Sequence, residues 1–97
     1  MSADSDRTGD AIPWLELACG DLVTAEAAQA DWRVPARNVA FHAQQAVEKA
    51  LKAALVLDGR KAPKSHDLDD LRNRLPAGWR VRKTHRDLSR LTQFAVE

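Results

Sequence analysis

The stretch from residue 36 to residue 57 constrains the fold of this chain more than any other part. It reads ARNVAFHAQQAVEKALKAALVL and stands between Pro35 and Gly59, residue types that start and stop helices. At about 100° per residue, its apolar side chains gather on one side of a helix. They are mostly small: Ala40, Ala43, Val47, Ala50, Leu51 and Ala54. The pattern predicts one long helix from Pro35 to about Asp58, with a face that a neighbouring helix can approach closely.

A preceding helix is expected to begin near Pro13, with Asp10 close by as a cap. Its apolar residues recur at spacings of three and four, the pattern of a buried helical stripe. They are Trp14, Leu17, Ala18, Leu22, Ala25 and Ala28. Asp21 falls within this stripe and must be paired there, because an unpaired buried charge is costly. It either bonds a neighbouring helix or lines a polar pocket.

Two more helices are expected after the long one. The first of them has Ser65 as its cap, acidic residues early and basic residues late, which suits the helix dipole, and it ends at Pro76 and Gly78. A last helix is expected from about Thr84. The residues expected to be buried are Leu68, Leu71 and Leu75 in the former and Leu88, Leu91 and Ala95 in the latter.

The composition fits a small helical domain. The chain has 97 residues, of which 44% are hydrophobic and 30% charged, and neither repeats nor strand-like alternation is seen. We therefore predict an all-α protein, an antiparallel up-and-down bundle of four or five helices over residues 12–97. Residues 1–11 are expected to be a disordered leader and not a signal peptide.

The expected location is the cytoplasm, with no membrane contact. No apolar run approaches the roughly 18 residues that a membrane span needs. The single cysteine, Cys19, excludes an internal disulfide and fits a reducing compartment. We expect Cys19 to be a small core residue of the first helix and not a nucleophile.

Charge is distributed unevenly along the chain although the net charge is only +1. Residues 1–32 hold seven acidic residues and one arginine, whereas residues 72–90 hold seven basic residues and one aspartate. Such an asymmetry is typical of a surface for nucleic acid or an acidic partner. It equally fits an acidic helix packed beside a basic segment of the same bundle.

Polar side chains of the long helix also follow helical spacing. One row is Arg37, Phe41, Gln44, Glu48 and Lys52, and a second beside it is Asn38, His42, Gln45 and Lys49. Glu48 stands four residues before Lys52, the favourable order for an ion pair within a helix. An ion pair does not explain two adjacent glutamines and a histidine. A pocket for a nucleotide, or a helix of a partner, would use them.

The segment FHAQQAVEKALKAAL is followed, after a proline-containing loop, by SHDL, and the preceding helix begins with Trp14 and contains Asp21. In these features the sequence resembles the HEPN family (higher eukaryotes and prokaryotes nucleotide-binding). The resemblance covers roughly residues 13–97. It implies a helical bundle, often dimeric, that binds nucleotide or RNA. Many members are encoded beside a minimal nucleotidyltransferase in toxin–antitoxin-like pairs, and several are metal-independent ribonucleases. A homodimer and a nucleotidyltransferase partner are therefore expected here.

The ribonucleases of this family use an arginine, four to six other residues, and then a histidine. Arg37 and His42 fit that spacing, with Asn38 directly after the arginine, and the resemblance implies that they form a catalytic pair. His42 would move a proton and Arg37 would steady the phosphate charge. Five residues turn His42 about 140° from Arg37 on a helix, so the two would meet only if two subunits combine. Two other pairs, Arg60/His66 and Arg80/His85, have similar spacing.

The candidate residues for binding a nucleotide or a partner are Gln44, Gln45, Glu48, Lys49, Lys52, His66 and Asp21. His66 precedes a helix start, where free backbone N–H groups favour phosphate, but it is equally an ordinary first-turn residue. No metal site and no cofactor are expected, because no histidine or cysteine pair has ligand spacing and no glycine-rich loop occurs. Trp79, in the basic stretch, is the aromatic residue to test for RNA contact.

Three functions remain open. The first is a ribonuclease that acts through Arg37 and His42, as the resemblance implies. The second is a non-catalytic binding or assembly module that acts through the row containing Gln44, Glu48 and Lys52, and the third is a regulatory fragment of a larger protein.

Overall fold

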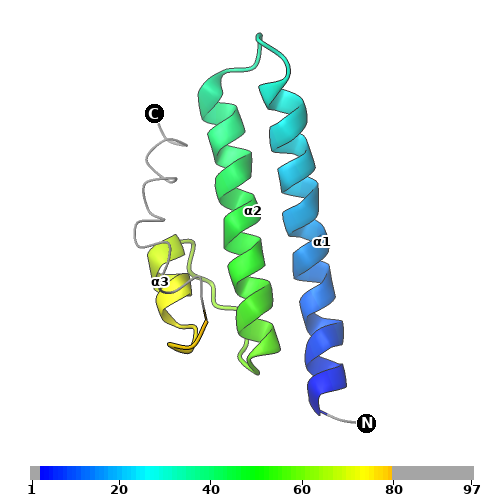
Figure 1. Ribbon diagram of the computed structural model, residues 1–97, viewed down its shortest axis with the longest axis vertical. Helices are drawn as coiled ribbons and strands as arrows, with labels where there is room; N and C mark the ends of the chain where they lie inside the picture. Colours follow the sequence, from blue (N-terminus) through cyan, green and yellow to red (C-terminus); the bar gives the residue numbers. More distant parts are fainter. Residues whose placement is uncertain (1–2, 80–97) are drawn as a thin grey trace.

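The computed structural model describes residues 3–79, with side chains from Arg7 onward. This part of the chain holds three helices and no strand: α1 (Ala3–Gln29), α2 (Ala36–Leu57) and α3 (Leu68–Asn73). Helices α1 and α2 run antiparallel along their whole length, and α3 lies beside the second half of α2 on the side away from α1 (Figure 1). The all-α prediction is confirmed. A bundle of four or five helices is not supported, and the helix expected from Thr84 lies outside the described residues.

Helix α2 matches its prediction closely. It is unbroken from Ala36 to Leu57, directly after Pro35. Its end is closed by backbone hydrogen bonds from Asp58 to the carbonyl of Ala54 and from Gly59 to that of Val56. Gly59 has a φ of +89°, in the left-handed region that glycine enters at no steric cost.

Helix α1 begins earlier than predicted. It starts at Ala3 and contains Pro13 in its interior, so the expected start near Pro13 is wrong, and residues 3–11 of the expected leader are helical. The predicted stripe of α1 is confirmed in part. Ala18 and Ala25 are buried as predicted, but Leu17 and Leu22 are about half exposed, and Ala11, outside the predicted stripe, is buried.

The physical reason is the spacing of the contact residues in α1. The buried and half-buried positions of α1 follow a repeat of three and four: Ala11, Trp14, Ala18, Asp21, Ala25 and Ala28. Four of these six residues are alanine. Small side chains let two helix backbones approach closely, and the larger leucines are left beside the seam.

The leucine-rich core lies between α2 and α3. Leu51 and Leu55 of α2 pack with Leu68, Leu71 and Leu75, and the three last residues are buried as predicted. A smaller cluster of Ala11, Ala53 and Val56 joins α1 to the end of α2, with Trp14 and Ala62 partly buried against it. The core therefore anchors one end of the helical hairpin.

The cap of α3 is Asp67 and not Ser65. The Asp67 carboxylate accepts hydrogen bonds from the backbone N–H groups of Asp69 at 3.0 Å and Asp70 at 3.2 Å. Ser65 acts one step earlier, because its hydroxyl accepts a hydrogen bond from the N–H of Asp67 at 3.1 Å. The hydroxyl of Ser65 and the carboxylate of Asp67 thus bind successive backbone N–H groups, which fixes the path of the chain into α3.

The predicted small-residue face of α2 is covered only in part. Leu51 is buried, but Ala50 is exposed and the others are half-buried. Together with α1, these residues leave an apolar groove of about 420 Å³ along the hairpin. It is lined by Leu15, Ala18, Cys19, Leu22, Ala43, Ala46, Val47 and Ala50, and we refer to it as the apolar groove. Cys19 is exposed there, so its prediction as a core residue is wrong.

None of the described helices combines the length and the apolar character that crossing a membrane requires.

Candidate functional site

The most unusual feature of α2 is that its polar row is buried. Gln44, Glu48 and Lys52 are 6%, 3% and 4% exposed, respectively. Their burial is tolerated because, within the described residues, no buried side-chain nitrogen or oxygen lacks a hydrogen-bond partner. These side chains therefore work inside the chain and do not form an open pocket. Around them the structure builds two groups of contacts, each with one carboxylate and one imidazole.

The first group joins α1 to α2 through Asp21. Its carboxylate accepts a hydrogen bond from the Lys49 ammonium at 2.5 Å, and its other oxygen lies 3.5 Å from Nδ1 of His42. Burial raises the pKa of Asp21, but the hydrogen bonds and charges of Lys49 and His42 outweigh burial and hold that pKa below its ordinary value. The sequence required a partner for Asp21, and the structure supplies two.

His42 is held from a second side by an aromatic contact. The ring of Phe41 meets the imidazole edge to face, with 5.4 Å between centroids and 78° between planes. The His42 side chain remains 34% exposed, and that of Lys49 22%. Both therefore reach the surface from fixed positions.

The second group joins α2 to the loop before α3 through Glu48. Nδ1 of His66 lies 3.1 Å from both carboxylate oxygens of Glu48. Lys52 approaches the same carboxylate at 3.4 Å, and its ammonium lies 5.5 Å from the ring centroid of Trp14 on α1. This cation–π contact helps to keep the lysine charge inside the fold. The Lys52–Trp14 contact was not predicted from the sequence, because the relative register of two helices is not encoded in either one.

The remaining glutamine, Gln45, lies between these groups. Its amide nitrogen donates to the side-chain oxygen of Gln44 at 3.3 Å, and Gln45 itself is half-buried. The contact orients the outer amide by means of the buried one. Asn38, one turn before His42, is exposed.

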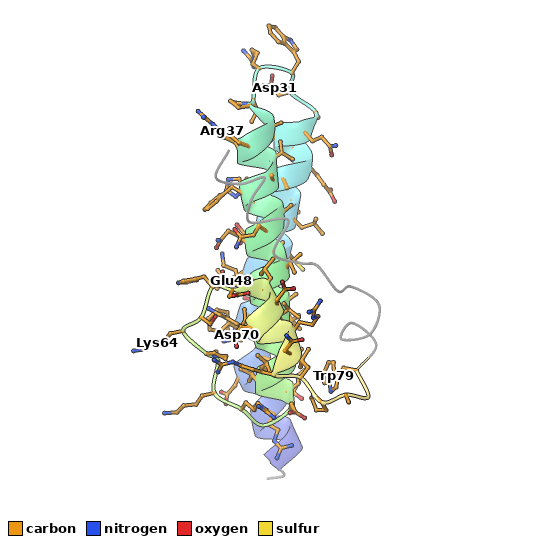
Figure 2. All side chains as sticks on the ribbon, turned by 90° about the vertical axis from the view of Figure 1, so that its left-hand side faces the viewer. Asp31, Arg37, Glu48, Lys64, Asp70 and Trp79 are labelled. Atoms are coloured by element: carbon orange, nitrogen blue, oxygen red, sulfur yellow. The ribbon has the colours of Figure 1, made fainter. Side chains whose placement is uncertain are left out.

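The structure does not bring Arg37 and His42 together. Arg37 is exposed near the turn between α1 and α2 and points away from the helices, far from Glu48 in the middle of α2 (Figure 2). Because α2 is one unbroken helix, the two side chains leave it about 140° apart. Of the other two pairs with this spacing, Arg60 bonds Asp58 at 3.3 Å, and Arg80/His85 lies outside the described residues.

Two further expectations concern metals and tryptophans. In the stretch from residue 3 to residue 79, no group of three or more histidine, cysteine, aspartate or glutamate residues is placed to hold a metal ion. Trp79 is half-buried against the leucine core, whereas Trp32, in the turn after α1, is 91% exposed. Among the aromatic residues that the structure describes, Trp32 is therefore the most exposed, which the sequence pattern did not single out.

Comparison with known proteins gives one match. A family model described as the HEPN domain matches residues 13–97. Searches of curated proteins and of solved structures gave no significant match. The matched region covers α1 from Pro13 onward, all of α2 and α3, and the two carboxylate–imidazole groups, so the chain belongs to the HEPN domain family.

Proposed function

We propose that this HEPN-domain protein binds a nucleotide or RNA through the polar flank of α2, which consists of Asn38, His42, Gln45 and Lys49. The observation that carries the proposal is the dual contact of Asp21 with His42 and Lys49. It holds an imidazole and an ammonium at the surface in fixed positions, and fixed donors lose less entropy when they bind phosphate. Gln45 adds an amide, which pairs with base edges.

Binding of a fluorescently labelled single-stranded RNA, followed by anisotropy, tests this proposal. Gln45→Ala and Lys49→Ala should each weaken binding about threefold to tenfold. Gln29→Ala is the matched control for the amide, because Gln29 is exposed on α1. An affinity equal to that of the wild type in both Gln45→Ala and Lys49→Ala would refute the proposed face.

The ribonuclease hypothesis remains the second candidate, with Arg37 and His42 as its residues. The exposure of Arg37 and the fixed position of His42 suit it only if the two residues come from different subunits. Metal-free RNA cleavage that is lost in Arg37→Ala and in His42→Ala would support it. Mixing the two variants should then restore about a quarter of the activity, because half of the dimers would hold one intact composite site.

No recovery in the mixture would exclude a composite site between subunits. Cleavage that survives His42→Ala would show that this histidine is not catalytic.

An assembly role has its own support in the apolar groove of the hairpin. Monomeric proteins rarely expose a continuous apolar surface without a function for it, and here Leu15 and Leu22 are both more than 40% exposed at its rim. We propose a homodimer and a minimal nucleotidyltransferase as partners, the second on the support of the family match alone. Light scattering of the pure chain, and co-expression with a nucleotidyltransferase from the adjacent reading frame, test the two separately.

A further inference from the structure

We propose that His66 and the loop before α3 form a second binding site, for the phosphate group of a nucleotide or RNA. The site is separate from the polar flank of α2, because its imidazole comes from the loop before α3 and its carboxylate is Glu48 and not Asp21. It rests on the proposed function only for the identity of the ligand, a nucleotide or RNA, to which the phosphate group belongs. Its core is the contact between His66, whose side chain is 78% exposed, and Glu48, whose side chain is 4% exposed.

The buried carboxylate determines which nitrogen of His66 faces outward. A carboxylate only accepts hydrogen bonds, so the nitrogen that lies 3.1 Å from both Glu48 oxygens carries a proton. Nε2 is then left on the exposed side of the ring. In this arrangement the hydrogen bond to Glu48 fixes the orientation of the imidazole, so that its other nitrogen is available to a ligand.

Lys52 and Trp14 keep Glu48 in place. Lys52 bonds the carboxylate from within the same helix, and Trp14 covers the ammonium from α1. The Glu48–Lys52 ion pair is therefore held in position by α1 and α2. Because Glu48 is fixed, its hydrogen bond with His66 sets the orientation of the His66 imidazole, although His66 belongs to a loop.

The loop supplies positive charge without counter-ions. Between Gly59 and Asp67, Lys61 and Lys64 are the two cations that make no ion pair within the described structure, while Arg60 is paired with Asp58. Lys64 extends from the loop into solvent (Figure 2). The carboxylate of Asp67, beside His66, is occupied by the N–H groups that it caps. The loop that carries His66 thus contributes two lysines, while the carboxylates of Glu48 and Asp67 are both engaged in hydrogen bonds.

These features define how phosphate would bind. His66 keeps Nδ1–H on Glu48, and when the imidazole takes up a second proton together with the anion, Nε2–H donates to one phosphate oxygen. Lys61 and Lys64 add long-range attraction. The geometry requires no metal ion and no bond is formed or broken.

Histidine-selective NMR of the full chain tests the proposal. Long-range ¹H–¹⁵N spectra distinguish the two neutral tautomers, and we expect His66 to be the Nδ1–H form. Added inorganic phosphate, adenosine monophosphate and a short RNA should each move the His66 signals in a saturable way. A response to the two small phosphates would show that the phosphate group is sufficient, and a response to RNA alone would assign the site to polymer backbone. An Nε2–H tautomer, or His66 signals that none of the three ligands moves, would overturn the proposal.

Variants sharpen this test. Lys64→Ala should weaken phosphate binding severalfold, and Arg33→Ala is its control, an exposed cation in the turn at the far end of the hairpin. Glu48→Gln should weaken it about tenfold, because the imidazole is no longer held by a charge-assisted hydrogen bond. Equal effects of Lys64→Ala and Arg33→Ala would count against a local site.

Failure here is distinguishable from failure of the proposed function. If RNA binds and shifts His42 and Gln45 but not His66, the polar flank is correct and the loop site is wrong. If phosphate shifts His66 but no RNA binds, the loop site stands and the polar flank fails.

Discussion

The two carboxylate–imidazole groups of this protein use the same chemistry in opposite arrangements. In the first, Asp21 and His42 both belong to helices, and Lys49 shares the carboxylate. In the second, Glu48 belongs to α2 and its carboxylate is buried, while its partner His66 belongs to a loop and is mostly exposed. The element that carries the histidine therefore decides its role. Asp21 and His42 join two helices, whereas Glu48 presents His66 to solvent.

The largest loss of stability is expected when the more deeply buried of the two carboxylates, that of Glu48, is removed. Glu48→Ala leaves Lys52 buried without its partner, and breaking a buried ion pair from one side costs about 3–5 kcal/mol of unfolding free energy. Urea unfolding followed by circular dichroism measures this cost. The double variant Glu48→Leu with Lys52→Met should recover most of it, since a well-packed apolar pair often replaces a buried ion pair. A single variant as stable as the wild type would mean that Glu48 is not buried as described.

A smaller effect is expected at the first group. Asp21→Asn should lower the unfolding free energy by about 1–2 kcal/mol at neutral pH, because a charged acceptor is lost while Lys49 still reaches water. The pKa of Asp21 in the folded protein is lowered, so its contribution is complete above the ordinary value of 3.8 and is lost as the pH falls through the lowered pKa. The gap in stability between wild type and Asp21→Asn should therefore close in acid. A gap that stays constant from neutral pH into strong acid would show that Asp21 is not the titrating group.

The loop that carries His66 gives the third comparison. Asp67→Ala should cost about 1 kcal/mol, because the N-cap of α3 is lost, and Ser65→Ala should cost less. Thermal unfolding of the two variants ranks them. The reverse order would restore Ser65 as the cap.

The smallest effect is expected at His66 itself. His66→Ala should change stability by about 0.5 kcal/mol or less, since the imidazole itself is mostly exposed and Glu48 keeps its contact with Lys52. The same variant should no longer bind inorganic phosphate, measured by the phosphate-induced shifts of the backbone amides in the loop before α3. A large loss of stability would indicate that His66 mainly stabilises the fold and is not primarily a residue that binds phosphate.

Local signals made α2 and the leucines of α3 predictable. Pro35 and Gly59 mark the ends of α2, and leucine spacing shows what α3 buries, because both features act within a few residues. The start of α1 was missed because helix continued through Pro13, against its usual effect in a helix interior.

The arrangement of the site was less predictable. The helical wheel grouped Gln44, Glu48 and Lys52 correctly, but it does not tell which side of a helix the rest of the chain covers. Lys52 and Glu48 are covered through tertiary contacts with Trp14 and His66, residues far away in sequence. The need of Asp21 for a partner was visible, whereas the identity of that partner depended on the register between α1 and α2.

The most direct test of the account is a map of chemical shifts on the full ¹⁵N-labelled chain as a short single-stranded RNA is added. We predict saturable shifts at His42, Gln45 and Lys49, with the signals of the apolar groove unchanged. Shifts confined to the groove, or no saturable shift anywhere, would contradict a nucleotide- or RNA-binding role for the polar flank of α2.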